Sequence, residues 1–370
     1  MRVAIEHLLA TAGIEVDGAR PWDIQVHDQR FFARVWSDRH LGLGESYMDG
    51  WWDCPQLDEF IARLLRAGVE QRLELTPWLA LQAMVQRWFN FQTRRRAWQV
   101  AVRHYDLGNE LFQAMLDPGM SYSCAYWRDA RTLAEAQANK LELVCRKLQL
   151  EPGMRLLDIG CGWGALARHA ARNHGVDVVG ITLSRAQQQF AQEACAGLPV
   201  VIRLQDYRDL PSEPFDRVAS IGMFEHVGHR NYPAFLDGVA SRLTGQGLFL
   251  LHTIGNDNPG PVADPWLRKY IFPNGEIPSP AGLTRALAGR FVLEDWHNFG
   301  NDYDLTLMAW YRNFSDRWNT LPARFDQRFF RMWSYYLLSC AGAFRARSPQ
   351  LWQLVLSRHG LAGGYQGRQT

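Results

Sequence analysis

Residues 154–164 read Met-Arg-Leu-Leu-Asp-Ile-Gly-Cys-Gly-Trp-Gly, and this stretch decides the fold. Its apolar first half, 154–159, predicts a buried strand, and glycines then follow at alternate positions. Glycine lets the chain bend sharply and lets a ligand approach bare backbone at the N-terminus of a following helix. A helix is expected over 165–174 and a second strand over 176–181. The stretch therefore predicts one strand-helix-strand unit of a parallel sheet.

The same alternation of helix and strand continues on both sides of this unit. Thr132 and Glu135 form a capping box that opens a helix over 132–148, and Ser184 with Gln187 forms a second box that opens another helix. Further strands are expected at 200–205, 215–221 and 247–253. Strands that alternate with helices in this way predict an α/β fold with a doubly wound, Rossmann-like sheet.

The first 90 residues are less regular and predict a smaller, mixed α+β N-terminal domain. A short helix is expected over 4–12, strands over 23–26 and 31–35, and helices from Leu57 onward. A chain of 370 residues also exceeds the usual size of one domain, which favours two. We therefore divide the chain into residues 1–90 and a larger α/β domain, residues 91–370.

Composition and charge exclude several classes of protein. The chain has 370 residues, 47% of them hydrophobic, and its formal net charge of +2 is too small for a nucleic-acid-binding surface. Its six cysteines include no CxxC pair, which argues against structural zinc, a thioredoxin-type motif and a disulfide framework, and favours the cytoplasm. We expect no metal. The N-terminus lacks a cleavable signal and no apolar run could span a bilayer, so any membrane contact is expected to be peripheral.

The glycine turn by itself leaves the ligand open. A dinucleotide site would need Gly-x-Gly-x-x-Gly and an acidic residue at the end of the second strand, but residues 180–184 read Gly-Ile-Thr-Leu-Ser. Nicotinamide binding is therefore disfavoured. The alternative is a tight strand-to-helix turn that binds no ligand.

Residues 156–164 resemble the first S-adenosylmethionine motif of Rossmann-like methyltransferases. Nearly the whole chain resembles the cyclopropane-fatty-acyl-phospholipid and mycolic acid cyclopropane synthase family of these enzymes. The other stretches that carry this resemblance are residues 41–52, 105–109, 122–127, 222–228, 251–255 and 340–345.

The resemblance implies a methyltransferase whose cofactor is S-adenosylmethionine. It also implies that polar residues of 182–187 make the ribose contacts that a carboxylate makes in many other methyltransferases. Ser184 and Gln187 can equally be a capping box, and both interpretations can hold together. The implied cofactor contacts are Tyr122, Ser123, Leu157, Asp158, Gly160, Gly162, Gly164, Ala165, Thr182, Leu183, Ser184, Gln187, Asp206 and Tyr207.

The reaction that the family performs needs a base, because ring closure removes a proton from the transferred methyl group. The resemblance implies a bound bicarbonate ion for this role. Tyr303 and His252 could donate hydrogen bonds to the ion, and ionised Glu225 could accept one from its hydroxyl. Alternatively, Glu225 is itself the base, His252 is a satisfied core histidine, and the cysteines are small buried hydrophobes. The residues implied to form this catalytic group are Cys124, Glu225, His252, Tyr303 and Cys340.

Methyl transfer to an alkene leaves positive charge on the acyl chain, so the site must be dry and electron-rich. Aromatic faces meet this need, although an aromatic side chain in such segments is more often plain core. We assign no individual role among the candidates, which are Tyr126, Trp127, Trp266, Tyr270, Phe272, Trp310 and Tyr311.

The implied substrate is an unsaturated acyl chain of a membrane phospholipid, so the enzyme is expected at the inner face of the cytoplasmic membrane. Arginines interleaved with aromatics over 87–103 suit an interfacial helix facing an anionic surface, or equally a domain-linking helix. The resemblance implies that residues 1–90 contribute lipid binding and homodimer formation. The alternatives are a lipid methyltransferase that leaves an uncyclised, methyl-branched product, and a non-catalytic lipid-binding protein.

Overall fold

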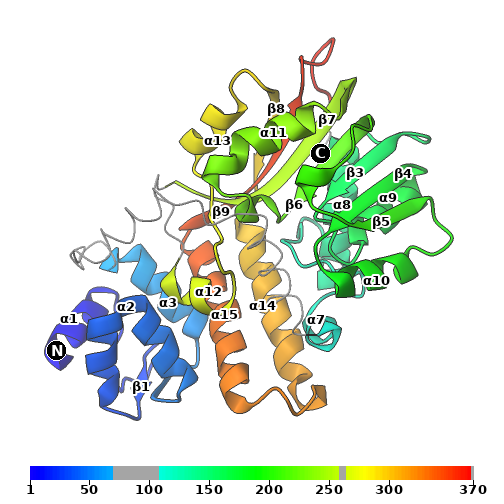
Figure 1. The fold of residues 1–370 in the computed structure, drawn as a ribbon. Helices are drawn as coiled ribbons and strands as arrows, with labels where there is room; N and C mark the ends of the chain where they lie inside the picture. The colour runs from blue at the N-terminus through cyan, green and yellow to red at the C-terminus, as the bar shows by residue number, and fades with distance from the viewer. Residues whose placement is uncertain (70–107, 258–263, 368–370) are drawn as a thin grey trace.

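The computed structural model describes residues 1–69, 108–257 and 264–367. Its centre is a seven-stranded sheet with the strand order β5-β4-β3-β6-β7-β9-β8 (Figure 1). The first five strands of this order run parallel, and β9 is antiparallel to both β7 and β8. The strands are β3 Arg155–Ile159, β4 Asp177–Thr182, β5 Val200–Leu204, β6 Phe215–Ile221, β7 Leu243–Asn256, β8 Val292–Asn298 and β9 Pro349–Ser357. The predicted α/β class is confirmed.

Helices cover both faces of the sheet because the central strands are apolar on both sides. Leu156 packs in one core with the helices on its face, and the next residue, Leu157, packs in a second core on the opposite face. This alternation is the pleat of a strand buried on both faces. The first core involves α8 Leu133–Lys147, α9 Ala165–His174 and α10 Arg185–Ala194, and the second involves α11 Tyr232–Ala240 and α13 Pro280–Leu287.

The carboxyl edge of the sheet contains the switch point of the topology. The chain moves outward from β3 through β4 to β5, and then returns to place β6 on the other side of β3. Crevices that bind ligands open at such a point, outside the carboxyl ends of the strands. The fold therefore puts the glycine turn after β3 where a ligand is expected.

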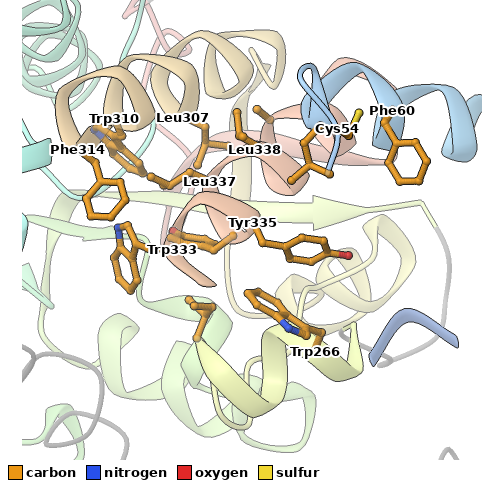
Figure 2. Close-up of a cluster of buried hydrophobic side chains, with 14 of the residues drawn as sticks. Cys54, Phe60, Trp266, Leu307, Trp310, Phe314, Trp333, Tyr335, Leu337 and Leu338 are labelled. Carbon is orange, nitrogen blue, oxygen red and sulfur yellow. The ribbon is translucent and has the colours of Figure 1, made fainter. Parts of the chain in front are cut away.

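A helical hairpin extends from this edge of the sheet. It consists of α14 Asn301–Asp316 and α15 Gln327–Arg345, inserted between β8 and β9 (Figure 1). One large hydrophobic cluster joins the hairpin to the N-terminal helices α1 Arg2–Thr11, α2 Arg30–Met48 and α3 Leu57–Arg66, and to α7 Asn109–Met115 and α12 Pro265–Tyr270. Figure 2 shows side chains from this cluster, with Trp310, Phe314 and Trp333 at the left of the view and Trp266 near Tyr335. The predicted boundary at residue 90 lies outside the described residues, and the division into two domains stays a prediction.

Two expectations for the N-terminal region need correction. The strand expected at 31–35 is wrong, because these residues lie in α2; the helix buries Phe31 and Phe32 and packs Val35 against the same cluster. The strand expected at 23–26 shrinks to β1 Gln25–Val26, which pairs with β2 Trp52–Asp53. The secondary structure of both segments is set by packing on the N-terminal core, which a short local pattern does not encode.

Other boundaries follow the local signals closely. Thr132 caps α8 with both hydrogen bonds of the capping box. The second box is half formed: Ser184 Oγ accepts from the backbone N–H of Gln187, but the side chain of Gln187 bonds Thr182 instead of returning to Ser184. The physical reason is that Thr182 Oγ1 already accepts from the backbone N–H of Ser184.

The N-terminal helices approach the hairpin closely at Gly342 of α15. A Cβ atom there would overlap the carbonyl oxygen of Asp58 in α3, and would lie 3.0 Å from Ile61 Cβ and 3.1 Å from the backbone nitrogen of Ala62. The absence of a side chain at Gly342 therefore allows α3 and α15 to pack in contact.

We expect Gly342→Ala to destabilise the protein, against the direction of helix propensity. Propensity alone favours alanine by about 0.5–1 kcal/mol, whereas overpacking costs about 1–3 kcal/mol. Gly238→Ala in α11 is the matched control, because its nearest neighbour to a new Cβ is Arg242 Nη1 at an ordinary 3.6 Å. Urea unfolding should show a lower midpoint for Gly342→Ala and an equal or higher one for Gly238→Ala. Equal stabilisation by both would contradict the packing argument.

Candidate active site

A cavity of about 200 Å³ opens at the carboxyl ends of β3, β4 and β6. Its wall contains most of the expected cofactor contacts, namely Tyr122, Ser123, Asp158, Gly160, Gly162, Ala165, Thr182, Leu183, Ser184, Gln187, Asp206 and Tyr207. Leu157 and Gly164 are not part of the wall. The Leu157 side chain points into the core on the other face of the sheet, and a Cβ at Gly164 would lie 3.0 Å from Ala191 Cβ. Gly164 therefore allows α9 and α10 to pack closely.

The glycine turn forms one side of this cavity. The carbonyl of Ile181 accepts hydrogen bonds from the backbone N–H groups of Gly160 and Cys161, at 3.0 and 2.9 Å, which ties the turn to the end of β4. Gly162 has a positive φ of +54°, and a Cβ there would meet no atom of the described residues within 4 Å. The bare backbone of Gly162 therefore faces open space.

The polar part of the wall, after β4 and β5, is held by its own hydrogen bonds. Thr182 Oγ1 donates to Gln187 Oε1 at 2.8 Å, which fixes the amide of Gln187 beside the cavity. Asp206 accepts from Arg208 Nη2 at 2.6 Å and Nε at 2.8 Å. Arg208 was missed by the sequence analysis although it also lines the cavity.

Lys140 is a further wall residue that the sequence analysis missed. It is almost fully buried, and its Nζ donates to Ser123 Oγ at 3.1 Å. Burial lowers the pKa of Lys140 to about 8, against the opposing pull of acidic neighbours including Asp117 and Asp158. Burial likewise raises the pKa of Asp158 to about 7, opposed by Lys140. Lys140 lies on the buried face of α8, between Ala136 and Val144, and a lysine at such a position could have been recognised from the sequence.

Ile159, Cys161 and Trp163 also line the wall and lie within the stretch 157–165, where cofactor contacts were expected. The wall residues outside the expected stretches come from separate segments, which no single local pattern could join. They are Met120, Ser121, Leu141, Leu166, Ile181, Gln205, Ile221, Gly222, Met223, His226, Pro273 and Asn274.

A second group of polar side chains lies beside the cavity. Glu225 follows β6 in a short 3-10 turn, His252 lies on β7 opposite the end of β6, Tyr303 is in the first turn of α14, and Cys340 is in α15. Cys124 adjoins Tyr122 and Ser123 of the cavity wall. The nearby Cys124, Tyr122, Glu225 and Cys340 add to burial in raising the pKa of Tyr303 well above its usual value. The hairpin and the sheet edge thus bring these groups together.

Hydrogen bonds orient Glu225 and His252. Glu225 Oε1 accepts from the backbone N–H of Ile254 at 2.6 Å. Gln353 Nε2 donates to His252 Nδ1 at 3.2 Å, which leaves the ring hydrogen on Nε2 when the imidazole is neutral. Burial lowers the pKa of His252 well below its usual value and raises that of Glu225.

Two atoms of this group are buried without a hydrogen-bond partner among the described residues, namely Glu225 Oε2 and His252 Nε2. Buried polar atoms are almost always paired, so such atoms mark a site for a ligand or water. Their chemistry fits a small group that can both donate and accept hydrogen bonds. The hydroxyl of Tyr303, which its raised pKa keeps protonated, adds a second donor.

Aromatic rings form the other wall of this group. The Tyr122 ring centroid lies 5.1 Å from that of Trp310, Tyr303 lies 6.0 Å from Trp310, and the hydroxyls of Tyr122 and Tyr336 are 2.8 Å apart. Of the aromatic candidates, Trp310 is therefore at the site. Phe272 reaches it through Tyr336, at 5.7 Å between ring centroids.

The remaining aromatic candidates have other neighbours. Tyr126 packs 5.5 Å from Phe299, which shares a small apolar cluster with Cys124. Trp266 makes an edge-to-face contact with Tyr335 in the large cluster (Figure 2), and the Tyr270 hydroxyl donates a hydrogen bond to Glu45. Trp127 donates its indole N–H to Thr306, and burial with nearby Asp58 raises the pKa of Tyr311. Trp266, Tyr270 and Tyr311 thus belong to the packing of the N-terminal helices.

Comparison with known proteins identifies the family of the chain. The family model described as mycolic acid cyclopropane synthetase matches residues 92–354. The chain is 55% identical over 357 residues, which is 96% of its length and 93% of the relative's, to the cyclopropane-fatty-acyl-phospholipid synthase of Escherichia coli strain K12.

Two solved structures share the fold of 70% of the chain. The cyclopropane synthase MmaA2 from Mycobacterium tuberculosis has a TM-score of 0.66 and 32% identity, covering 70% of this chain and 98% of that one. The mycolic acid cyclopropane synthase CmaA1 complexed with SAH and CTAB has a TM-score of 0.67 and 33% identity, with the same two coverages.

The thiol of Cys340 is expected to react slowly. Burial raises its pKa from 9.0 to about 12, which lowers the thiolate fraction at neutral pH about a thousandfold. Alkylation of Cys340 by iodoacetamide, followed by mass spectrometry, should accelerate about tenfold per pH unit between about pH 7 and 9 without a plateau. The unfolded chain is the control and should react much faster. A plateau below pH 8 would indicate an activated nucleophile instead.

Proposed function

The chain belongs to the cyclopropane synthase family of S-adenosylmethionine-dependent methyltransferases, and on that premise we propose its reaction. It transfers the methyl group of S-adenosylmethionine to the double bond of an unsaturated acyl chain of a membrane phospholipid and closes a cyclopropane ring. One observation carries this proposal: a buried, aromatic-walled group of polar side chains adjoins the cavity at the glycine turn.

The residues that line the cavity suit the methyl donor. S-adenosylmethionine, when bound, supplies an electrophilic methyl group on a sulfonium. The bare backbone at Gly162 leaves room for close approach, and Thr182 holds the Gln187 amide at the wall for polar contacts. Tyr122 and Ser123 belong to the same wall and precede Cys124. This segment would direct the methyl group toward the second polar group.

Aromatic side chains stabilise the positive charge that develops on the acyl chain. Tyr122, Tyr303 and Trp310 present rings to one another at the junction, and Trp310 is fully buried. A ring face near a cation contributes about 0.5–2 kcal/mol, most when water is excluded. The same burial protects a charged carbon from attack by water.

We further propose that bicarbonate is the general base, held by Glu225, His252, Tyr303, Cys124 and Cys340. When bound, it supplies a basic oxygen for the proton of the transferred methyl group. His252 Nε2–H and the Tyr303 hydroxyl would donate to it, and Glu225 Oε2 would accept from its hydroxyl. The pKa values of Cys124 and Cys340 are raised by burial, so both thiols stay protonated and line the site.

Peripheral contact with an anionic membrane surface, a homodimer and a cytoplasmic location stay predictions. The basic segment 87–103 lies outside the described residues. In the described part of the chain, no helix combines the length and apolarity needed to cross a bilayer.

We expect Gly162→Asn to abolish both cofactor binding and product while preserving the fold. Asparagine tolerates the left-handed backbone at this position, but its side chain would fill the space into which Gly162 opens. Gly197→Asn is the matched control, because Gly197 also has a positive φ, +79°, and open space, but lies outside the cavity wall.

The measurements are calorimetric titration with S-adenosylmethionine and mass spectrometry of phospholipids from expressing cells. Wild type and Gly197→Asn should bind the cofactor and add one CH₂ to acyl chains while removing their unsaturation. Retained binding in folded Gly162→Asn would refute the assignment of this turn. A gain of CH₂ as a methyl branch would refute ring closure.

The second test separates bicarbonate from Glu225 as the base. Wild-type activity should fall in CO₂-free buffer and return when bicarbonate is added. Glu225→Gln should lose an order of magnitude or more, because a charge-assisted contact contributes about 1.5–3 kcal/mol, and should need more bicarbonate. Glu110→Gln, which changes an exposed carboxylate paired with Arg324, should match wild type. A wild-type rate that stays constant through verified bicarbonate removal would exclude the ion.

A further inference from the structure

A cluster of metal-binding side chains lies between α8 and α9, apart from the polar group proposed to hold the base. Cys145 Sγ and one ring nitrogen each of His169 and His174 all lie within 4.8 Å of one another. Glu142 Oε2 lies 3.2 Å from His169 Nε2 and 3.1 Å from His174 Nε2. Two imidazoles therefore point at one carboxylate oxygen, with a thiol beside them.

Helix geometry produces this convergence. Glu142 and Cys145 are three residues apart on α8 and share one face of it. His169 lies within α9, and His174 is its last residue, followed by Gly175 in the left-handed conformation that ends the helix. Because α8 and α9 pack in one core, the two faces meet.

The ligand set matches zinc and related divalent cations. A thiolate, imidazoles and a carboxylate are the ligands of protein zinc sites, at about 2.3 Å for sulfur and about 2.0–2.2 Å for nitrogen and oxygen. Donors at a tetrahedral ion are thus separated by roughly 3.3–3.8 Å. The donors of Cys145, His169 and His174, which lie within 4.8 Å of one another, need only small side-chain movements to reach that spacing, and Glu142 Oε2 is already 3.2 and 3.1 Å from the two histidines. We propose that Glu142, Cys145, His169 and His174 form a binding site for a zinc-class cation.

The surroundings support a site that an ion can enter. Cys145 is fully buried and forms its floor, whereas the His169, His174 and Glu142 side chains are 17%, 18% and 38% exposed. Asn173 contacts His169 Nδ1 at 3.1 Å. With its amide turned over, Asn173 would accept from Nδ1–H and leave the Nε2 lone pair for the metal, which is the second-layer contact that metal-bound histidine normally makes.

Four protein ligands leave no open position, so the site is structural and takes no part in the proposed methyl transfer. Its effect would be to link α8 to α9. Both helices contribute to the cofactor cavity, α8 through Lys140 and α9 through Ala165 and Leu166. The ligands occur as Glu-x-x-Cys and, more than twenty residues later, His-x₄-His, which explains why the lack of a CxxC pair pointed away from metal.

The test uses the full chain, treated with a chelator and titrated with Co²⁺ as the probe. We expect one equivalent to bind, with a thiolate-to-cobalt charge-transfer band in the near ultraviolet and intense visible bands typical of tetrahedral cobalt. Zn²⁺ should displace it and raise the melting temperature by a few degrees, because it binds only the folded state. Cys145→Ala should remove the charge-transfer band, and Cys54→Ala, which removes a buried thiol elsewhere, should not.

His174→Gln provides an independent variant on the partly exposed side, where the fold is least at risk. It should weaken Co²⁺ binding at least about tenfold, as even second-layer changes commonly do, and abolish the Zn²⁺-dependent rise in melting temperature. The proposal is overturned if cobalt shows no stoichiometric binding, if it binds without a thiolate band, or if binding is unchanged in both ligand variants. Any of these results would make the cluster a hydrogen-bonded group only.

Discussion

The hydrogen bond from the backbone N–H of Ile254 to Glu225 Oε1, 2.6 Å long, is the contact around which the site is organised. It ties the turn after β6 to the end of β7, and so fixes a carboxylate where the sheet edge meets the helical hairpin. A carboxylate in such a place is costly unless its environment is rigid and complementary. The neighbouring side chains, from His252 on the sheet to Tyr303 on α14, supply that complementarity.

Helix α15 joins this site to the N-terminal helices. Cys340 and Tyr336 lie toward the site, since both interact with Tyr303, whereas Gly342 contacts α3 and Tyr335 packs on Trp266. The hydrophobic cluster of Figure 2 is therefore continuous from the N-terminal helices to the aromatic wall of the site. Substitutions that alter the packing of the N-terminal helices should therefore affect the site through α15.

The sequence predicted what local patterns encode. The strand, glycine turn and helix over 154–174, and the capping box at Thr132, appear as expected because hydrophobic period, glycine and caps act within a few residues. The strand at 31–35 failed because tertiary packing overrode a short pattern. Lys140 was signalled only by its place on the buried face of α8. The cluster at Cys145 could not be found in this way, since it depends on contacts between two helices that only the fold brings together. The residues proposed to hold the base came from family resemblance, since no spacing links Cys124, Glu225 and Cys340.

Burial favours the neutral form of the titratable groups of the site. It raises the pKa values of Glu225, Tyr303 and Cys340, and lowers that of His252, so each group is shifted toward its neutral form. In a site as dry as this, a sulfonium or an anion bound alone carries a large desolvation penalty. A cationic methyl donor and an anionic base bound side by side would compensate each other. In the proposed reaction, the exclusion of water that protects the positive charge on the acyl chain also couples the binding of S-adenosylmethionine to that of bicarbonate. Binding of either ligand should therefore strengthen binding of the other.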